Sequence, residues 1–427
     1  MVRRSGRGAC GGRPRACRRR GERRRGRGHI GGDPRRPRAA GEVVVSERSA
    51  RLAARLWDGE GARLALARLA LAPASALYAG VVLARNAAYR TGLVRTRRVG
   101  ARTVSIGNLR IGGSGKTPLT RWLAAEAQAR GIAVAIISRG YGGTTAAPHV
   151  VGDGATLRSD VAASGDEAVM LARTAAVPVV AGHDRAAAAA LAVETFGSRL
   201  LLCDDAFQHR RLARDVDIVL VDAGQRGGVT RLLPAGPLRE PLAALRRAHV
   251  IVVAERDAAG ATQSVPASRP DQLVVRARFA PTALLRVGPH AWEELGLAAL
   301  AGQRVLALSG VARPRPLYES LRDWEADLVH ILEYPDHHPY DIADWHEISH
   351  AAKDVEFVVT TEKDLVKLER FPFARGKLVA LRLGVTIDNP TALLARVLGP
   401  LAADVLAGVA AAGAQRPWHE RPPERGP

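Results

Sequence analysis

A glycine-rich segment between a predicted strand and a predicted helix constrains this chain more than any other feature. β-type residues 103–106 precede it and the amphipathic stretch Leu119–Arg130 follows it, and its own residues are Gly112, Gly113, Ser114, Gly115, Lys116 and Thr117. In such a loop, backbone N–H groups turn toward phosphate oxygens, the lysine reaches the β- and γ-phosphates, and the threonine hydroxyl can hold Mg²⁺. The motif predicts a nucleoside triphosphate site, although Arg110 stands where the full pattern has its first glycine. A glycine-rich turn without a ligand is the alternative.

The basic charge of the chain is concentrated at its beginning. The formal net charge is +21 over 427 residues, but residues 1–40 carry 15 arginines against Glu22 and Asp33, a net charge of +13. This segment has almost no apolar residues to bury, so we expect a disordered basic extension over residues 1–61. A nucleic-acid-binding arm is the alternative, which we do not expect because aromatic residues and a folded motif are lacking nearby.

The three cysteines, Cys10, Cys17 and Cys203, have neither paired nor metal-binding spacing and suit a reducing compartment. No apolar segment of signal-peptide type follows the early arginines, so export is not expected.

Residues 62–98 form a separate segment with an apolar centre and basic flanks. Leu69–Ala84 is rich in Leu, Ala and Val, contains Pro73, and is followed by Arg85 and further arginines. A membrane-crossing helix needs about 20 apolar residues. We therefore predict an interfacial helix on anionic headgroups, with a helix packed on the protein as the alternative.

From residue 99 onward, apolar β-type runs alternate with helical runs. The predicted strands are Val134–Ser138, Pro178–Ala181, Arg199–Cys203, Asp217–Val221 and Val250–Ala254. The predicted helices are Leu119–Arg130, Asp166–Thr174, Asp184–Phe196 and Leu238–Arg247. This alternation predicts an α/β fold of the P-loop type, a parallel sheet with helices on both faces, over residues 99–267.

The later part of the chain repeats this pattern on a smaller scale. Residues 268–287 form a strand-rich connector, and residues 288–408 form a smaller C-terminal α/β lobe. Its predicted strands are Arg304–Ser309, Leu328–Leu332, Val355–Thr360 and Leu378–Arg382, and its last helix is 390–407. Residues 409–427 are predicted to be a loose tail.

A pair of acidic residues follows one of the predicted strands. Asp204 and Asp205 come directly after Leu200–Cys203, where a P-loop fold places a carboxylate beside the Mg²⁺ held by the loop hydroxyl. Polar strings also follow other strands, at the sheet edge where ligands bind in doubly wound folds. They are 138–143, 165–167, 204–209, 233–241 and 335–340.

These strings, in this order over residues 66–405, resemble the tetraacyldisaccharide 4'-kinase family. The resemblance implies an ATP-dependent and Mg²⁺-dependent enzyme that phosphorylates the 4'-hydroxyl of the lipid A disaccharide 1-phosphate precursor. It further implies a location at the cytoplasmic face of the bacterial inner membrane, without an obligate protein partner. The family's loop falls on residues 112–117 and also lacks the earlier glycine, which removes the objection from Arg110.

The resemblance also assigns roles to particular residues. In the family, the Asp that falls on Asp166 is the base, paired with the His that falls on His337. The family string at 204–209 has Ala206 in place of Gly, and the string Gly236–Pro241 is unchanged, which gives Arg239 and Glu240 as active-site residues.

The residue types permit these roles. Lys116 and Mg²⁺ would take negative charge, Asp166 oriented by His337 would accept the hydroxyl proton, and Arg239 could bind phosphate oxygens, as could Arg139. The expected metal ligands are Thr117, Asp204, Asp205 and Glu240, where Glu240 either ligates Mg²⁺ or holds Arg239.

Two segments depart from the family pattern. Residues 310–314 lack the usual Asn, and residues 223–227 are altered, which bears on lobe contacts and substrate fit. The string Thr360–Asp364 resembles another family string, which we interpret as structural.

Two other functions fit the residues: a soluble P-loop kinase for another small hydroxylated substrate, and an ATPase that switches conformation. The sequence leaves open the acyl chains of the acceptor, the oligomeric state, which of Asp204 and Asp205 meets metal, whether residues 1–40 are made, and whether the N-terminal helix inserts.

Overall fold

The computed structural model describes residues 56–57, 59, 61–113, 115–222, 231–255, 269–288, 292–373 and 376–402. Most of the predicted extension over 1–61 and the whole predicted tail over 409–427 lie outside these residues, as do Ser114 and residues 223–227.

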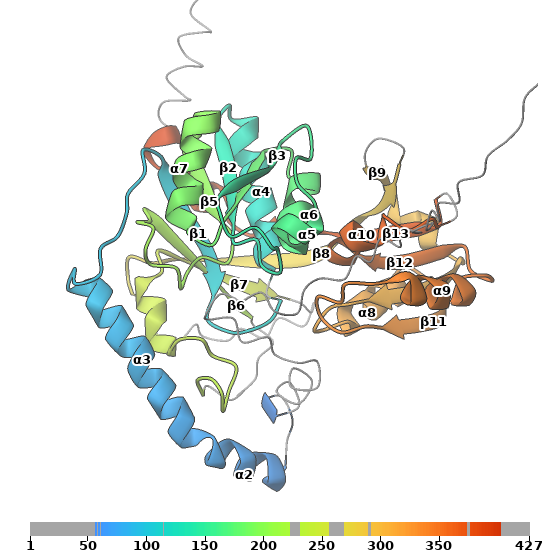
Figure 1. The fold of residues 1–427 in the computed structure, drawn as a ribbon, viewed down its shortest axis with the longest axis horizontal. Helices are drawn as coiled ribbons and strands as arrows, with labels where there is room; N and C mark the ends of the chain where they lie inside the picture. The colour runs from blue at the N-terminus through green and yellow to red at the C-terminus, as the bar shows by residue number, and fades with distance from the viewer. Residues whose placement is uncertain are drawn as a thin grey trace, which may run out of the picture. The chain divides into compact units, whose positions relative to one another are not determined.

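The described strands form one 13-stranded sheet that runs through both predicted lobes (Figure 1). The strand order is β11-β10-β12-β13-β8-β7-β6-β1-β5-β2-β4-β3, with β9 paired to β8. The strands of the first half are β1 (Arg102–Asn108), β2 (Val134–Ser138), β3 (His149–Asp153), β4 (Pro178–Ala181), β5 (Leu200–Cys203), β6 (Val216–Asp222) and β7 (Val250–Glu255). The others are β8 (Leu273–Val287), β9 (Trp292–Leu295), β10 (Arg304–Ser309), β11 (Asp327–Glu333), β12 (Phe357–Thr361) and β13 (Leu378–Ile387).

Helices cover both faces of the first half, as the apolar strands require. Alternate residues of a strand point to opposite faces, and in β5 Leu200 and Leu202 join one apolar cluster whereas Leu201 and Cys203 join another. The first cluster packs against α4 (Lys116–Ala129) and α6 (Asp166–Thr174), and the second against α7 (Arg185–Phe196). The short helix α5 (Val161–Ser164) precedes α6. The prediction of a parallel sheet covered on both faces is confirmed for this half, with β3 added as an antiparallel edge strand.

The strand-rich connector is the element that joins the two halves. β8 pairs with β7 in parallel and with β13 in antiparallel register, so the sheet continues without a break. The second half carries α8 (Arg315–Asp323), α9 (Ile342–Ala351) and α10 (Glu362–Leu368), and the 3₁₀ helix Leu297–Leu300. The last helix, α11 (Pro390–Leu398), returns to the first half, where its leucines enter the cluster around α4.

The prediction of an α-helix over Leu238–Arg247 is wrong both in the type of helix and in its first residue. The structure has only a 3₁₀ helix over Leu242–Arg247. Pro241 lacks an N–H and disfavours helical geometry at the residue before it, so the helix begins only after Pro241.

The N-terminal segment forms two helices, α2 (Ala62–Ala70) and α3 (Ala72–Arg90). Polar side chains along α3 attach it to the first half: Ser75 donates to the Leu232 carbonyl, Tyr78 to the Arg239 carbonyl, and Asn86 to the Glu240 carboxylate. Within the described residues, neither helix meets the length and hydropathy of a membrane span, whereas the two together, bent by 49° at their break, do so by length and composition.

Candidate active site

The phosphate-binding loop connects β1 to α4, as predicted. Gly115 has a φ of +85°, and a Cβ there would lie 2.5 Å from the Phe279 ring, so only glycine fits this turn. Lys116 is the first residue of α4 and Thr117 the second. The N–H groups of this first turn have no partner within the helix and can bind phosphate oxygens. Gly112 and Gly113 lie earlier in the loop, whereas Ser114 lies outside the described residues.

The two carboxylates after β5 point to the start of α4 but differ in their surroundings. Asp204 accepts hydrogen bonds from the hydroxyls of Thr117 (3.3 Å) and Thr120 (3.2 Å). Burial, followed by the charge of Glu167, raises the pKa of Asp204 to about 6. Of the two acids, Asp204 is therefore the one whose carboxylate contacts the hydroxyl of Thr117 in the loop.

Asp205 is held by two cations instead. Its carboxylate lies 3.6 Å from the Lys116 ammonium and 3.0 Å from the Arg239 guanidinium. Burial raises the pKa of Asp205, but the charges of Lys116 and Arg239 outweigh burial and lower it to about 2. Asp205 therefore orients Lys116 and Arg239, two residues predicted to bind phosphate.

Glu240 does not join this cluster, in contrast to the expectation that it ligates metal or holds Arg239. It is 1% exposed, and its two oxygens accept hydrogen bonds from the Arg247 guanidinium (2.7 and 3.1 Å) and the Asn86 amide (2.9 Å). A carboxylate whose oxygens are both occupied by a cation and an amide is poorly placed to ligate Mg²⁺. Its observed role is to anchor α3 to the first half.

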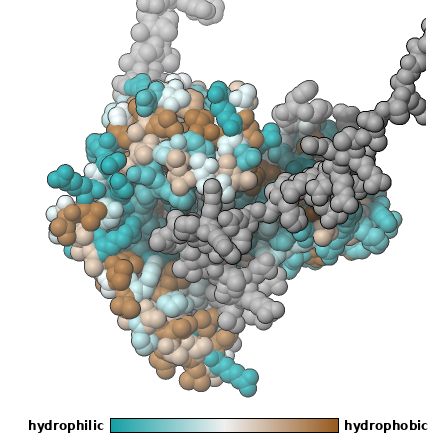
Figure 2. All heavy atoms as spheres, viewed as in Figure 1, coloured by the Kyte–Doolittle hydropathy of each residue, from teal (hydrophilic) through white to brown (hydrophobic). Residues whose placement is uncertain are grey.

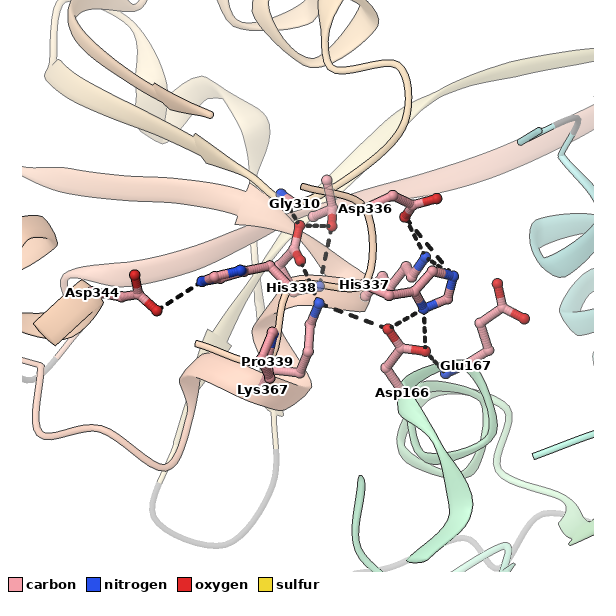
Figure 3. A network of polar contacts seen from close by, with 12 residues as sticks. Asp166, Glu167, Gly310, Asp336, His337, His338, Pro339, Asp344 and Lys367 are labelled. Carbon is pink, nitrogen blue, oxygen red and sulfur yellow. Dashed lines mark hydrogen bonds and ion pairs between the residues drawn. The ribbon is translucent and has the colours of Figure 1, made fainter. Parts of the chain in front are cut away.

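Asp166 and His337 meet although they are 171 residues apart (Figure 3). The Asp166 carboxylate lies 2.9 and 3.2 Å from Nδ1 of His337, and the Glu167 N–H donates to it at 2.9 Å. Asp166 begins α6 after Gly165, whose φ of +81° and closeness to the Tyr141 carbonyl exclude a side chain. His337 is itself in a left-handed conformation, with a φ of +62°. Such backbone strain is typical of functional sites.

Cations keep Asp166 ionised. Burial raises its pKa, but the hydrogen bond from His337 and the charges of Lys363 and Lys367 outweigh burial and lower it below the usual range. α6, which begins with Asp166, packs in the same apolar cluster as α4, and the charge of Glu167 raises the pKa of Asp204, so the Asp166–His337 pair lies on the side of the sheet that carries the phosphate-binding loop.

The sequence interpretation missed two lysines of this site. Lys363 and Lys367 lie on α10, and the ammonium of Lys363 is 2.9 Å from Nε2 of His337. The string Thr360–Asp364 held a signal for Lys363, which its interpretation as structural missed, whereas Lys367 lies beyond that string. Arg185 was also missed: it is 3% exposed and donates to the backbone carbonyls of Asp204 and Asp205.

Among the described residues, no group of three or more His, Cys, Asp or Glu side chains is arranged to hold a metal ion.

Three comparisons with known proteins agree with one another. The family model LpxK, described as tetraacyldisaccharide-1-P 4'-kinase, matches residues 67–401. The tetraacyldisaccharide 4'-kinase of Anaeromyxobacter dehalogenans strain 2CP-C is 43% identical over 274 residues, 62% of this chain and 72% of its own. That of Anaeromyxobacter sp. strain K is 41% identical over 330 residues, 74% of this chain and 84% of its own.

The fold is similar to a solved structure, described as the "apo" form of LpxK from Aquifex aeolicus in complex with ATP. The TM-score is 0.67 at 29% sequence identity, and the match covers 77% of this chain and 98% of that one.

Proposed function

The chain belongs to the tetraacyldisaccharide-1-P 4'-kinase family, and from this premise we propose that it transfers the γ-phosphoryl group of ATP to the 4'-hydroxyl of the tetraacyl disaccharide 1-phosphate precursor of lipid A. The observation that carries the proposal is the contact of Asp166 with His337 beside the phosphate-binding loop. Phosphoryl transfer to a sugar hydroxyl needs in-line positioning, neutralisation of charge, and an acceptor for the hydroxyl proton.

The loop before α4 binds the triphosphate of ATP. The turn at Gly115 directs the first N–H groups of α4 outward, and the Lys116 side chain, 12% exposed, is held toward the same edge by Asp205. A fixed ammonium at this position stabilises the negative charge of the phosphates without reorganisation during the reaction.

Thr117 and Asp204 fit a role in holding Mg²⁺. Both offer oxygen atoms, which this ion prefers. Because burial and Glu167 disfavour the ionised form of Asp204, its carboxylate needs a further positive charge nearby. Held by Thr117 and Asp204, the ion would supply positive charge that neutralises the phosphates. Asp205 is occupied by Lys116 and Arg239 and orients these two cations for the phosphates.

Asp166 accepts the proton of the attacking hydroxyl. Its carboxylate is ionised, and the hydrogen bond from His337 fixes its orientation. Arg239, 29% exposed and held by Asp205, presents its remaining N–H groups to phosphate oxygens of ATP or of the acceptor.

The acceptor is a lipid, and the N-terminal helices offer a surface for the membrane. Figure 2 shows hydrophobic side chains gathered over α2 and α3. On the helix positions that do not contact the first half, Leu69 is 64%, Leu77 is 73% and Val81 is 60% exposed. We place this surface on the cytoplasmic face of the inner membrane, where basic flanks such as Arg63 and Arg90 meet anionic headgroups.

Transfer of labelled phosphate from ATP to a tetraacyl disaccharide 1-phosphate in detergent tests the function, with NMR of the product to locate the new phosphate. We expect phosphate at the 4' position with wild-type protein and with the exposed control Asp354→Asn. Asp166→Asn should retain ATP binding and lose most of the transfer. Absence of transfer by the wild type, or phosphate at another position, would refute the proposal.

Flotation with vesicles that contain anionic lipid tests the membrane surface. The pair Leu77→Glu and Val81→Glu should release the protein from vesicles, while its transfer to acceptor dispersed in detergent stays near wild type. Unchanged flotation of this variant would exclude α3 as the membrane contact.

A further inference from the structure

Both ring nitrogens of His337 are engaged, and by groups of opposite charge. Nδ1 faces the Asp166 carboxylate at 2.9 Å, and Nε2 faces the Lys363 ammonium at 2.9 Å. Figure 3 shows the ring between Asp166 of α6 and Asp336 of its own loop. The imidazole thus connects a carboxylate of the first half to a cation on α10.

Lys363 is held in its charged form. Burial lowers its pKa, but the charges of Asp166, Asp336 and Glu167 outweigh burial and raise the pKa above the usual value. Its ammonium also donates to the Asp336 carboxylate at 2.8 Å. An ammonium has three donors and no acceptor, so at Nε2 the ring must be the acceptor. The ring proton then lies on Nδ1, toward Asp166.

We propose that Lys363 is a positioning residue for phosphoryl transfer. Its ammonium keeps His337 neutral, with the ring proton on Nδ1. This inference deepens the proposed function and rests on it. The ammonium blocks a second proton at Nε2 through both its hydrogen bond and its charge. A neutral ring orients Asp166, whereas an imidazolium would draw on the carboxylate's negative charge and make it a poorer proton acceptor.

The other charged groups around the pair do not replace Lys363. Lys367 lies 3.7 Å from Asp166 and 2.9 Å from Asp364, so it acts on the carboxylate and not on the ring. Asp336 lies 3.9 Å from Nε2 and 2.8 Å from the Lys363 ammonium, so it holds the lysine in place. Glu167, from α6, adds negative charge that favours the ammonium.

Four variants test the role of Lys363: Lys363→Met removes the charge at similar length, Lys363→Arg keeps it, Asp336→Asn loosens the lysine, and Lys353→Met is an exposed control. We expect Lys363→Met to lower kcat about 10- to 100-fold, by analogy with histidines at metal sites that lose their hydrogen-bond partner, with KM for ATP little changed. The acid limb of the kcat profile should move up by about one pH unit, because Nε2 can then take a proton. Lys363→Arg should restore the wild-type profile.

The kcat of each variant is compared with that of the wild type in the same transfer assay. If the wild type gives no product, the proposed function itself has failed, and this result is distinct from a failure of the inference about Lys363. Loss from Lys363→Met should nearly vanish in a His337→Ala background, because the lysine acts through the ring. A wild-type kcat and pH profile for Lys363→Met would overturn the inference. So would a loss of kcat from Lys363→Met that is as large in the His337→Ala background as in the wild type. If Lys363→Met fails to fold, Asp336→Asn decides: a smaller shift of the acid limb supports the inference, and an unchanged profile overturns it.

Discussion

The buried ion pair between Arg121 and Glu362 should hold the phosphate-binding helix to α10. Arg121 lies on α4, Glu362 begins α10, and their side chains are 10% and 9% exposed. Arg121 also donates to the Leu383 carbonyl. Removal of one partner leaves a buried charge without compensation, which costs about 3 to 5 kcal/mol. We therefore expect Arg121→Met to lower the free energy of unfolding by that amount and the melting temperature by on the order of 10 °C.

The pH dependence of this loss has a definite sign. Burial raises the pKa of Glu362, and Arg121 only partly offsets burial. A carboxyl group whose folded-state pKa lies above its unfolded value stabilises most below the unfolded pKa, and this contribution is lost as pH rises through the folded pKa. In Arg121→Met, Glu362 can take up a proton, so the destabilisation should be larger at pH 8 than at pH 5.

Thermal and urea unfolding of both single variants and of Arg121→Met with Glu362→Leu provides the assay. The double variant should recover most of the lost stability, because an apolar pair replaces an ion pair at little cost. The exposed pair Arg130 and Glu126 at the C-terminal end of the same helix is the control, and its loss should cost at most about 0.5 kcal/mol. A melting temperature of Arg121→Met within 1 °C of wild type, on the order of experimental error, would refute the reasoning, as would strictly additive single losses.

Two further predictions concern the backbone before Asp166 and a buried histidine. Gly165→Ala should lower kcat, because the added Cβ would lie 2.0 Å from the Tyr141 carbonyl. The control Gly197→Ala also changes a glycine at positive φ but has open space around it, so it should lower only the melting temperature. Equal kcat values for the two variants would contradict this prediction. Burial, followed by the charge of Arg185, lowers the pKa of His209 to about 4, so its contribution to stability is present above pH 6.5 and is lost as pH falls through the folded pKa. Between pH 7 and pH 5, His209 should therefore contribute at most about 1.4 kcal/mol per pH unit to the slope of the free energy of unfolding, measured in urea. The slope should be smaller in His209→Gln, and an unchanged slope would argue against this.

The sequence was sufficient for the elements whose signals are local. The loop before α4, the acids after β5 and the buried strands of the first half follow from glycine spacing, strand ends and apolar runs. The pairing of Asp166 with His337 came from the family resemblance, since nothing in the spacing of two residues 171 apart places them together.

Other features depend on tertiary packing that no local pattern encodes. The long strand β8 has polar and apolar residues in a pattern that fits a connector, and only its pairing with β7 and β13 makes it the centre of a continuous sheet. Glu240 was expected to ligate metal or to hold Arg239 because the family string over Gly236–Pro241 gave both as active-site residues. In the structure the two adjacent side chains diverge, so Arg239 contacts Asp205 while Glu240 contacts Arg247.

Lys363 is a further residue whose role the local sequence does not show. A charged side chain on a short helix is typical of a solvent-exposed position, and only the fold brings the first turn of α10 against the loop of His337. The Arg121–Glu362 pair was invisible for the same reason, since its partners lie 241 residues apart.

The central claim is that Asp166 and His337 act as one unit on the acceptor hydroxyl. A double-mutant cycle of Asp166→Asn and His337→Ala, measured as kcat of phosphate transfer to the lipid acceptor with ATP binding checked for each protein, tests it most directly. We predict a loss of about 10²- to 10⁴-fold for Asp166→Asn, and a double variant no slower than Asp166→Asn alone. A double variant whose loss equals the product of the two single losses, or an Asp166→Asn protein as fast as wild type, would contradict the claim.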